Sequence, residues 1–307
     1  MSAKSILKAL LIVVAICIAF YVYGRVEASN TEIRVEHVRV VPRLVESGSF
    51  TVAAYNIAHA RGAIKGTSNW GGSHTEKVER SRAIGEFLAT SDADVVILNE
   101  VDFDASWSGR QDQAMLIAKA GGFQYVARQV NFNLALPGFS LEFGNAILSH
   151  YPIIVADRVA LPTHSWLESL LFGNHDAIRA VVEVGESQEV EIWGLHLEVR
   201  DRVTRISAVE HIASQMDTAR PVVLAGDLNS QLSEGSSDPT ALSTLLHLTD
   251  FESFPSTNDS SMTFPTMAPK RTLDWIAHSP LLDASGGEVA DVQLSDHLPV
   301  LIRLRVL

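Results

Sequence analysis

The sequence predicts an α/β domain in which β-sheets are sandwiched by helices, preceded by one apolar N-terminal helix. Three observations lead to this fold class. Segments with a strand-like pattern outnumber helical ones, the helical segments fall between strands, and the chain opens with a long apolar run. With 47% hydrophobic and 20% charged residues, the 307-residue chain can bury a large core. No boundary is evident after residue 48, so we expect a single domain over residues 49–307.

The N-terminal segment, residues 1–24, is typical of a signal anchor or a signal peptide. Its apolar run from Ala9 to Tyr23 is intermediate between the roughly 7–15 residues of a signal-peptide core and the roughly 20 residues of a membrane span. Lys4 and Lys8 flank the start of the run, which predicts a cytoplasmic N-terminus and an exported body. The run has no periodic polar face, which argues against a buried core helix.

A cleavage site after this run would be poor. Val26 and Ala28 suit a signal peptidase, but Arg25 and Glu27 lie beside them. We therefore expect an uncleaved anchor that holds the domain at the cell envelope, outside the cytoplasm, with secretion as the alternative if the segment is cleaved. Residues 25–48 are polar and mixed, and we expect a linker with one short strand there.

The elements of the domain alternate along the chain. Each predicted strand is an apolar run, and several end in polar residues; the strands cover 49–57, 93–102, 144–153, 177–184, 190–198, 221–230, 272–279 and 298–306. The predicted helices cover 75–91, 111–122 and 202–219. The first helix has apolar residues at Val78, Ile84 and Leu88, and glycine closes the second. Residues 61–74 are rich in glycine and serine and predict a loop.

Two apolar inserts, 128–143 and 161–175, lack the periodicity of ordinary core elements. We interpret them as loops that pack on the domain. The alternative is an apolar rim near a site, suited to a lipid interface.

Charge and cysteine content exclude some functions. The formal net charge of −12 argues against an extended electrostatic contact with nucleic-acid phosphates, although an acidic protein can still carry a local basic cleft. Cys17 is the only cysteine, so the chain has neither an intrachain disulfide nor a cysteine-based metal site.

Polar residues collect where predicted strands end or begin. Each could be a turn residue by itself, but together they supply carboxylates, amides and two imidazoles. Strand ends in α/β folds converge on one edge, where ligands bind, so we expect a shared cleft. The residues are Asn56, Glu100, His196, Asp227, Asn229, Asp274, Asp296 and His297.

Over residues 50–305 the chain resembles the endonuclease/exonuclease/phosphatase superfamily, which includes DNase I, abasic-site endonucleases, neutral sphingomyelinases and inositol-polyphosphate 5-phosphatases. The motifs that carry the resemblance stand in the family's order: YNI, ILNEVD, GNAILSHYPI, GLHLE, LAGDLNS, LDWI and SDHLPV. The resemblance implies a DNase I-like four-layer α/β sandwich and metal-dependent phosphoester hydrolysis.

The resemblance also implies a metal site. Glu100 would hold the divalent metal, helped by Asn56 and Asp296. Because these are hard oxygen ligands without a thiolate, they suit Mg²⁺ or Mn²⁺. Some family members carry an acid two residues after the asparagine of the first motif, where this chain has Ala58, which weakens any second metal ligand at that position.

Catalytic roles carry over from the family in the same way. His297 would be the catalytic imidazole, with Asp274 fixing its tautomer. Asp227 and Asn229 would orient the attacking water and the phosphate, and His196 would donate to a phosphoryl oxygen. Two further residues match positions that contact the phosphate in some members, Arg179 and Asn145.

Three residues of the glycine-rich loop or next to it, His59, Arg61 and His74, could contribute to the site instead. We favour a surface-loop role for them. Of the remaining histidines, which we expect to be structural or solvated, His175 is the least certain.

Three substrates compete. A lipid headgroup phosphodiester fits the anchor and the apolar inserts, and a nucleic acid fits the superfamily but not the net charge. A small phosphorylated metabolite or an inositol phosphate is the third, and the inositol phosphate ranks lower because Lys270 and Arg271 are the only basic residues near LDWI. The alternative of another class is a non-catalytic binding module, which we disfavour because every charged motif residue is present.

Overall fold

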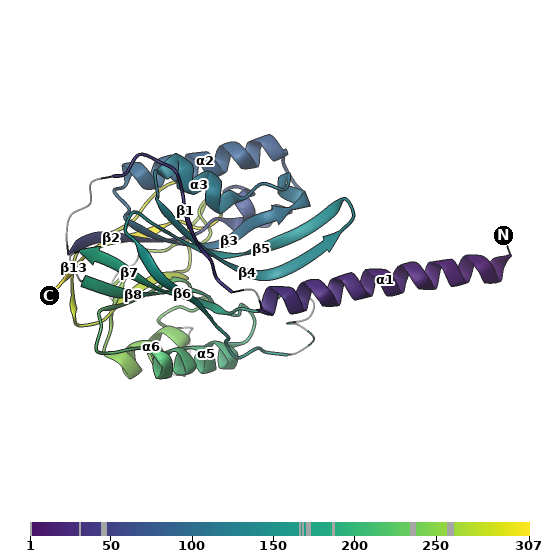
Figure 1. The fold of residues 1–307 in the computed structure, drawn as a ribbon. Helices are drawn as coiled ribbons and strands as arrows, with labels where there is room; N and C mark the ends of the chain where they lie inside the picture. Colours follow the sequence, from purple (N-terminus) through teal and green to yellow (C-terminus); the bar gives the residue numbers. More distant parts are fainter. Residues whose placement is uncertain are drawn as a thin grey trace.

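The structure, a computed structural model, describes residues 2–30, 32–43, 48–165, 167, 169, 173–185, 188–233, 238–256 and 261–307. Part of the insert 161–175 therefore lies outside the described residues. Within these ranges the chain forms two mixed sheets with helices on their outer faces, and one long helix projects from the domain (Figure 1).

The larger sheet has seven strands in the described part of the chain, in the order β1-β4-β5-β3-β2-β13-β12. Only β2 and β3 run parallel; the other neighbours are antiparallel. Its strands are β1 (Val35–His37), β2 (Ser49–Asn56), β3 (Val95–Ala105), β4 (Tyr125–Leu136), β5 (Phe139–Ser149), β12 (Leu282–Val289) and β13 (Val300–Val306).

The smaller sheet has six described strands in the order β10-β11-β9-β8-β7-β6. Here only β8 and β9 are parallel. Its strands are β6 (Ile153–Val159), β7 (Ala177–Gly185), β8 (Gln188–His196), β9 (Val222–Asp227), β10 (Glu252–Phe254) and β11 (Asp274–His278).

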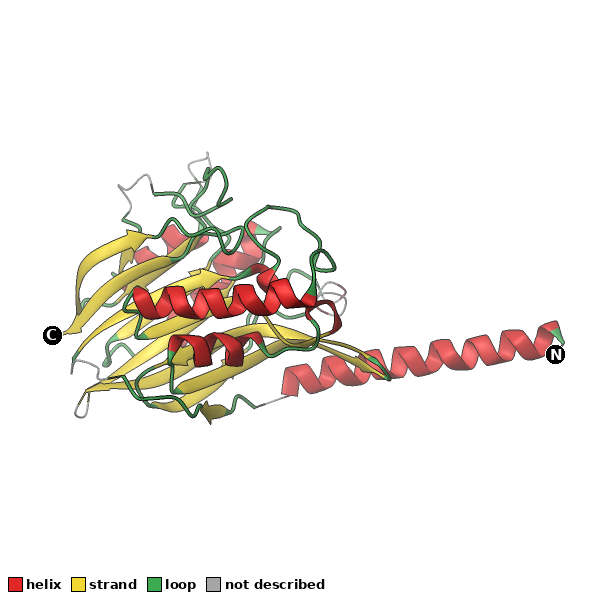
Figure 2. Ribbon diagram, turned by 90° about the horizontal axis from the view of Figure 1, so that it is seen from above, coloured by secondary structure: helices red, strands yellow, loops and turns green. Residues whose placement is uncertain are grey.

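Three apolar clusters hold four layers together. The first lies between the sheets, where residues such as Ile97 of β3 and Val223 of β9 pack together. The second lies between the larger sheet and helices α2 (His74–Thr90) and α3 (Gln113–Gly121). The third lies between the smaller sheet and helices α5 (Arg202–Gln215) and α6 (Ala241–Thr249). The predicted four-layer α/β sandwich is confirmed, and Figure 2 shows helices lying over the strands.

Side-chain caps fix where the helices begin. Ser73 and Glu76 form a capping box at the start of α2, and Asp112, Asp201 and Thr240 cap α3, α5 and α6. These caps satisfy amides that have no partner within the helix.

Helix α1 (Ala3–Asn30) projects away from the sandwich (Figures 1 and 2). Its segment Lys4–Ala28 contains an 18-residue stretch with a mean hydropathy of 2.6 and no buried residue, so the helix is long and apolar enough to cross a membrane, while Arg25 and Ala28 near its end are buried against the domain. The helix continues past residue 24 into the segment where we expected a linker. Arg25 binds the carbonyls of Asn131 (2.9 Å) and Ser169 (2.8 Å), which fixes the last turns of α1 to the domain.

The insert 128–143 is not a packed loop. It forms most of the long hairpin of β4 and β5, joined at residues 137–138, where Gly138 adopts a positive φ of 79°. That interpretation was wrong, and the sequence did carry the strand signal: Val130, Phe132 and Leu134 alternate with polar asparagines, and a second alternating run follows the turn residues 137–138.

One buried histidine makes the fold sensitive to acid. His150 stacks on Phe123 with ring centroids 4.5 Å apart, and neither ring nitrogen has a hydrogen-bond partner among the described residues. Burial, with the nearby Arg43 charge, lowers the pKa of His150 from 6.5 to about 4. The folded state therefore binds fewer protons than the unfolded state between these values, so stability is complete above pH 6.5 and falls as the pH drops toward 4.

Between pH 7.5 and pH 4.5 the free energy of unfolding falls. We expect this fall to be about 2 kcal/mol smaller in His150→Phe than in the wild type, after allowance for solvent screening. Urea unfolding of the detergent-solubilised protein at pH 7.5 and pH 4.5 (about one unit above and two below the ordinary histidine pKa) measures it. The exposed His247 of α6 provides the matched control, His247→Phe. If the free energy of unfolding fell equally from pH 7.5 to pH 4.5 in the wild type and in both variants, His150 would not be the source of the acid sensitivity.

Candidate active site

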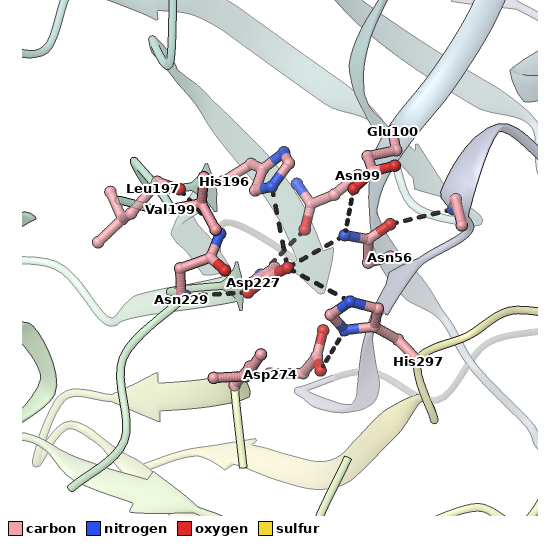
Figure 3. Close-up of polar contacts among 12 residues, drawn as sticks. Asn56, Asn99, Glu100, His196, Leu197, Val199, Asp227, Asn229, Asp274 and His297 are labelled. Atoms are coloured by element: carbon pink, nitrogen blue, oxygen red, sulfur yellow. Dashed lines mark hydrogen bonds and ion pairs between the residues drawn. The ribbon is translucent and has the colours of Figure 1, made fainter. Parts of the chain in front are cut away.

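The polar strand ends converge at one edge of both sheets (Figure 3). A cavity of about 350 Å³ opens there. It is lined by Arg61, Lys65, Gly66, Glu100, His175, His196, Val199, Asp227, Asn229, Phe264, Arg271, Leu273, Asp296 and His297.

Asp227, the last residue of β9, lies at the centre of the group. Its Oδ2 accepts a hydrogen bond from Asn56 Nδ2 at 3.0 Å, and lies 3.8 Å from His196 Nε2 and 3.7 Å from His297 Nε2. Its Oδ1 accepts the amide of Asn229 at 2.9 Å. Groups from four separate segments therefore surround one buried carboxylate (Figure 3).

His297 and Asp274 form a buried pair beside it. Nδ1 of His297 lies 2.8 Å from Oδ2 of Asp274, at the start of β11. Burial lowers the pKa of His297, but the negative charges of Asp274 and Asp227 outweigh it and raise the pKa to about 10. The imidazole is therefore protonated at neutral pH, with Nε2–H directed toward Asp227 and the cavity.

Glu100 reaches the site because β3 is irregular there. The pairing of β3 with β5 shifts between Leu98 and Val101, and Glu100 has a positive φ of 53°. Burial opposes the charge of Glu100, but His59, His196 and Arg61 outweigh it and lower the pKa to about 2. Asn56 Nδ2 donates to Glu100 Oε1 at 3.0 Å. Glu100 is therefore ionised at any physiological pH.

Arg61 bridges the two predicted acidic metal ligands. Its guanidinium donates to Glu100 Oε2 and to Asp296 Oδ2, both at 3.2 Å. The other oxygen of Asp296, Oδ1, is buried and has no hydrogen-bond donor among the described residues. A buried, unpaired carboxylate oxygen is costly unless a cation binds it. Glu100 and Asp296 thus fit a divalent cation through carboxylate oxygens. Asn56 instead turns its Nδ2 toward Glu100, and its Oδ1 accepts the Ala58 amide at 3.0 Å, so the predicted ligand role of Asn56 is not met in this arrangement.

A second group could also hold a cation. The potential ligand atoms of Asp227, Asp274 and His297 lie within 4.8 Å of one another. In this group Nδ1 of His297 already bonds to Asp274, which leaves Nε2 as its only free nitrogen. The first group is the better match for Mg²⁺, which prefers oxygen ligands.

The surface-loop interpretation of His59 and Arg61 was wrong. His59 is 6% exposed, and its Nδ1 lies 2.7 Å from Asp102 while its Nε2 lies 3.5 Å from Glu100. Burial opposes its charge, but Asp102 and Glu100 raise its pKa. The available signal was proximity in sequence, because both residues follow Asn56 within five positions. His74 is exposed at the start of α2, as expected.

Backbone strain is concentrated at this site. Five of the eight non-glycine residues with positive φ in the described ranges belong to it: Ala58, His59, Ala60, Glu100 and Asn229. Such conformations cost free energy and persist where the surrounding structure enforces them, often at active sites. In this chain they turn the segment after β2 back over the cavity.

His175 also belongs to the site. Its Nδ1 lies 3.1 Å from the His196 carbonyl, and its ring meets the His196 ring edge to face at 5.6 Å. Burial, reinforced by the charge of His196, lowers the pKa of His175 to about 4. This ring is therefore neutral and can serve as a hydrogen-bonding wall of the cavity.

Two predicted phosphate contacts do not reach the cavity. Arg179 of β7 pairs with the buried Glu191 at 2.9 Å. Asn145 of β5 is buried in a chain of amides, accepting from Asn99 (2.9 Å) and donating to Gln129 (3.2 Å). Neither lines the described cavity. Asn145 instead supports Asn99, whose Oδ1 accepts the amide of Asp227 at 3.0 Å.

Comparison with family models gives one match, to the Endonuclease/Exonuclease/phosphatase family, over residues 53–297. The matched range contains every predicted site residue. A search of curated proteins finds no match.

Solved structures share the fold at low identity. An endonuclease/exonuclease/phosphatase from Beutenbergia cavernae is 21% identical with a TM-score of 0.59, covering 84% of this chain and 72% of its own. A mannosyl-6-phosphatase from Bacteroides thetaiotaomicron is 15% identical with a TM-score of 0.60, and the match covers 83% of this chain and 99% of that chain. The human Nocturnin catalytic domain, solved with bound sulfate, is 16% identical with a TM-score of 0.57, and the match covers 92% of this chain and 99% of that chain.

Proposed function

Because the chain belongs to the endonuclease/exonuclease/phosphatase family, whose members hydrolyse phosphoesters, we propose that it is a divalent-metal-dependent phosphoester hydrolase anchored in a membrane. The observation that carries the proposal is the arrangement around Asp227. One buried carboxylate lies within 4 Å of two imidazoles, and one of these is held protonated by Asp274.

The residues divide the work of hydrolysis. Asp227 and Asn229 orient a water molecule toward phosphorus, and Asp227 accepts its proton as the new P–O bond forms. Protonated His297 donates from Nε2 to the phosphoryl group, where negative charge develops, while Asp274 fixes its tautomer. The P–O bond to the leaving group breaks, that oxygen takes up a proton from solvent, and Asp227 returns the proton it accepted to solvent. His196 adds a second donor beside Asp227.

Glu100 and Asp296 would hold Mg²⁺ or Mn²⁺, with Asn56 positioning Glu100 through the hydrogen bond from its Nδ2. When bound, the metal neutralises charge on the phosphate and polarises the phosphorus–oxygen bond. Arg61 donates to two of these ligands and supplies part of the same positive charge within the cavity.

The exported, membrane-anchored topology is supported by two features. Helix α1 is apolar, and its residues 4–20 are exposed. Lys4 and Lys8 near its start favour a cytoplasmic N-terminus, which would put the domain outside the cytoplasm. Among the candidate substrates, a lipid phosphodiester is the one that such an anchor would bring to the site.

A panel of hydrolysis assays tests the proposal. Whole protein in detergent or vesicles is given sphingomyelin and phosphatidyl lipids, plasmid DNA, and inositol phosphates, with Mg²⁺, Mn²⁺ or EDTA. We expect metal-dependent cleavage of a phosphoester, strongest with lipid, and its loss in EDTA because the oxygen ligands then lack their cation.

The matched controls are Asp227→Asn, which should be inactive, and Asp217→Asn, an acid in the turn after α5, which should match the wild type. Undiminished cleavage in EDTA would contradict metal dependence. Cleavage of DNA but not lipid would assign a nuclease, and no turnover of any substrate would favour a binding module.

A further inference from the structure

The catalytic edge of the sheets faces the same way as the free end of α1. β2 ends at Asn56 in the site, and β13 runs antiparallel to it, with Arg305 opposite Ser49. The C-terminus therefore lies at the opposite end of β2 from the site. In both ribbon views the C-terminus and the N-terminal end of α1 are on opposite sides of the molecule (Figures 1 and 2). The cavity is thus on the side from which α1 projects.

The β4–β5 hairpin extends beyond that edge. β3 continues from Glu100 to Ala105, which pairs with Leu141 of β5, so the turn at residues 137–138 lies farther out still. The hairpin projects along α1 (Figure 1). Close contacts fix the hairpin to α1. The backbones approach so closely at Gly24 that a Cβ there would lie 2.3 Å from the Asn133 carbonyl oxygen, and the Tyr21 ring meets the Phe132 ring edge to face at a centroid distance of 6.2 Å.

The hairpin end, residues 134–141, has the composition of a lipid contact. Its sequence, LALPGFSL, contains no charged residue. Ala135, Pro137 and Gly138 are exposed, and Leu136 and Phe139 are half-buried. Phe139 stacks with Trp70, whose own side chain is 59% exposed, at 6.1 Å. An exposed tryptophan stacked on a half-buried phenylalanine next to an apolar turn is typical of a membrane interface.

The depth of the hairpin end follows from helix and strand geometry. Lys4–Ala28 is ~37 Å long at ~1.5 Å per residue, against a hydrocarbon thickness of ~30 Å, so Gly24 falls near the outer interface. Asn133 touches Gly24. At ~3.3 Å per residue the turn lies at most ~13 Å farther along the hairpin, which reaches the headgroup region but does not cross the bilayer.

Other exposed apolar side chains stand near the ends of the strands that carry the candidate site. They are exposed by 49% to 69%: Ile64, Trp70, Leu167, Val199, Val203 and Met267. Val199 lines the cavity itself. Two cations at the mouth of the cavity, Lys65 and Arg271, flank Phe264 at 5.0 and 4.9 Å from its ring centre. Apolar and cationic groups together complement an anionic lipid surface.

We propose that this edge is a membrane-docking face, with the hairpin end, residues 134–141, seated among lipid headgroups and the catalytic cavity opening toward the bilayer. The inference rests on the proposed anchorage of α1. It makes the substrate a phosphoester at the membrane surface, because a face held against lipid admits headgroups more readily than long polymers from solution.

The single cysteine gives a direct test. In full-length protein in phosphatidylcholine–phosphatidylglycerol vesicles, an environment-sensitive fluorophore is attached at one position at a time. The positions are native Cys17 and, in a Cys17→Ser background, Pro137→Cys at the hairpin turn and Leu307→Cys at the opposite end of the domain. Each variant must keep the wild-type urea midpoint. Nitroxide-labelled lipids then report contact with the bilayer.

We expect lipid nitroxides to quench the probes at Cys17 and at Pro137→Cys and to leave Leu307→Cys unquenched. Quenching at Cys17 without quenching at Pro137→Cys would overturn the docking face and leave the anchor intact. An unquenched Cys17 would remove the anchorage and the inference with it. A Pro137→Cys probe shielded by a second copy would shift its emission without quenching by lipid nitroxides, which also overturns the proposal.

Discussion

Replacing His297 with alanine should lower kcat by about 10²- to 10⁴-fold, the range ascribed to a positioned acid or base. The reason is geometric and electrostatic. Asp274 holds Nδ1 at 2.8 Å, and the surrounding carboxylates raise the pKa of His297 to about 10, so the protein maintains a proton donor at Nε2. The measurement is kcat for the best substrate of the panel at saturating metal.

Alanine would also leave Asp274 buried without its partner, so a second variant separates catalysis from folding. His297→Asn keeps an amide donor for Asp274 but has no Nε2. We expect it to be as inactive as the alanine variant while its urea midpoint stays near the wild type. Wild-type turnover in a folded His297→Asn protein would remove His297 from the mechanism.

Replacing Glu100 with glutamine should raise the Mg²⁺ concentration for half-maximal activity at least ~10-fold, because one ionised oxygen ligand is lost. Lowering of the Glu100 pKa to about 2 means that the wild-type ligand is charged throughout the useful pH range. Titration calorimetry with Mg²⁺ alone measures the same change without turnover.

Asp104 supplies the matched control, since it lies four residues further along β3 and pairs with Arg110 at 2.7 Å, away from the cavity. Asp104→Asn should bind Mg²⁺ like the wild type. If Glu100→Gln and the wild type gave the same Mg²⁺ titration, Glu100 would have no role at the metal. Three acids would then remain as candidate metal ligands: Asp227, Asp274 and Asp296.

Family membership and the residues of the candidate site were accessible from the sequence for one reason. Each residue of the set follows or precedes an apolar strand, and the strands of an α/β sandwich end at common edges. Asp227 after the run of β9 and His297 before that of β13 needed no knowledge of distant contacts. The motif order added the expected roles.

Other features depended on contacts between distant segments. His59 and Arg61 enter the site only because residues 58–60 adopt left-handed conformations, which alanine and histidine rarely do. Arg179 pairs across the sheet with Trp193, whose ring packs under the outer helices, so its side chain leaves on that face. A shift of one position would reverse the direction, and the sequence of β7 does not specify it.

By itself the sequence determined eight of the strands, the helices α2, α3 and α5, the polar strand ends and the apolar N-terminal segment, because these follow from local composition and periodicity; β4, β6, β10, β12 and α6 were missed. Only the tertiary structure decided that α1 is fixed to β4, that the hairpin of residues 128–143 projects past the edge that carries the candidate site, and that Arg61 joins Glu100 to Asp296. These are relations between residues up to 235 positions apart, set by strand register and by packing between layers rather than by any local pattern.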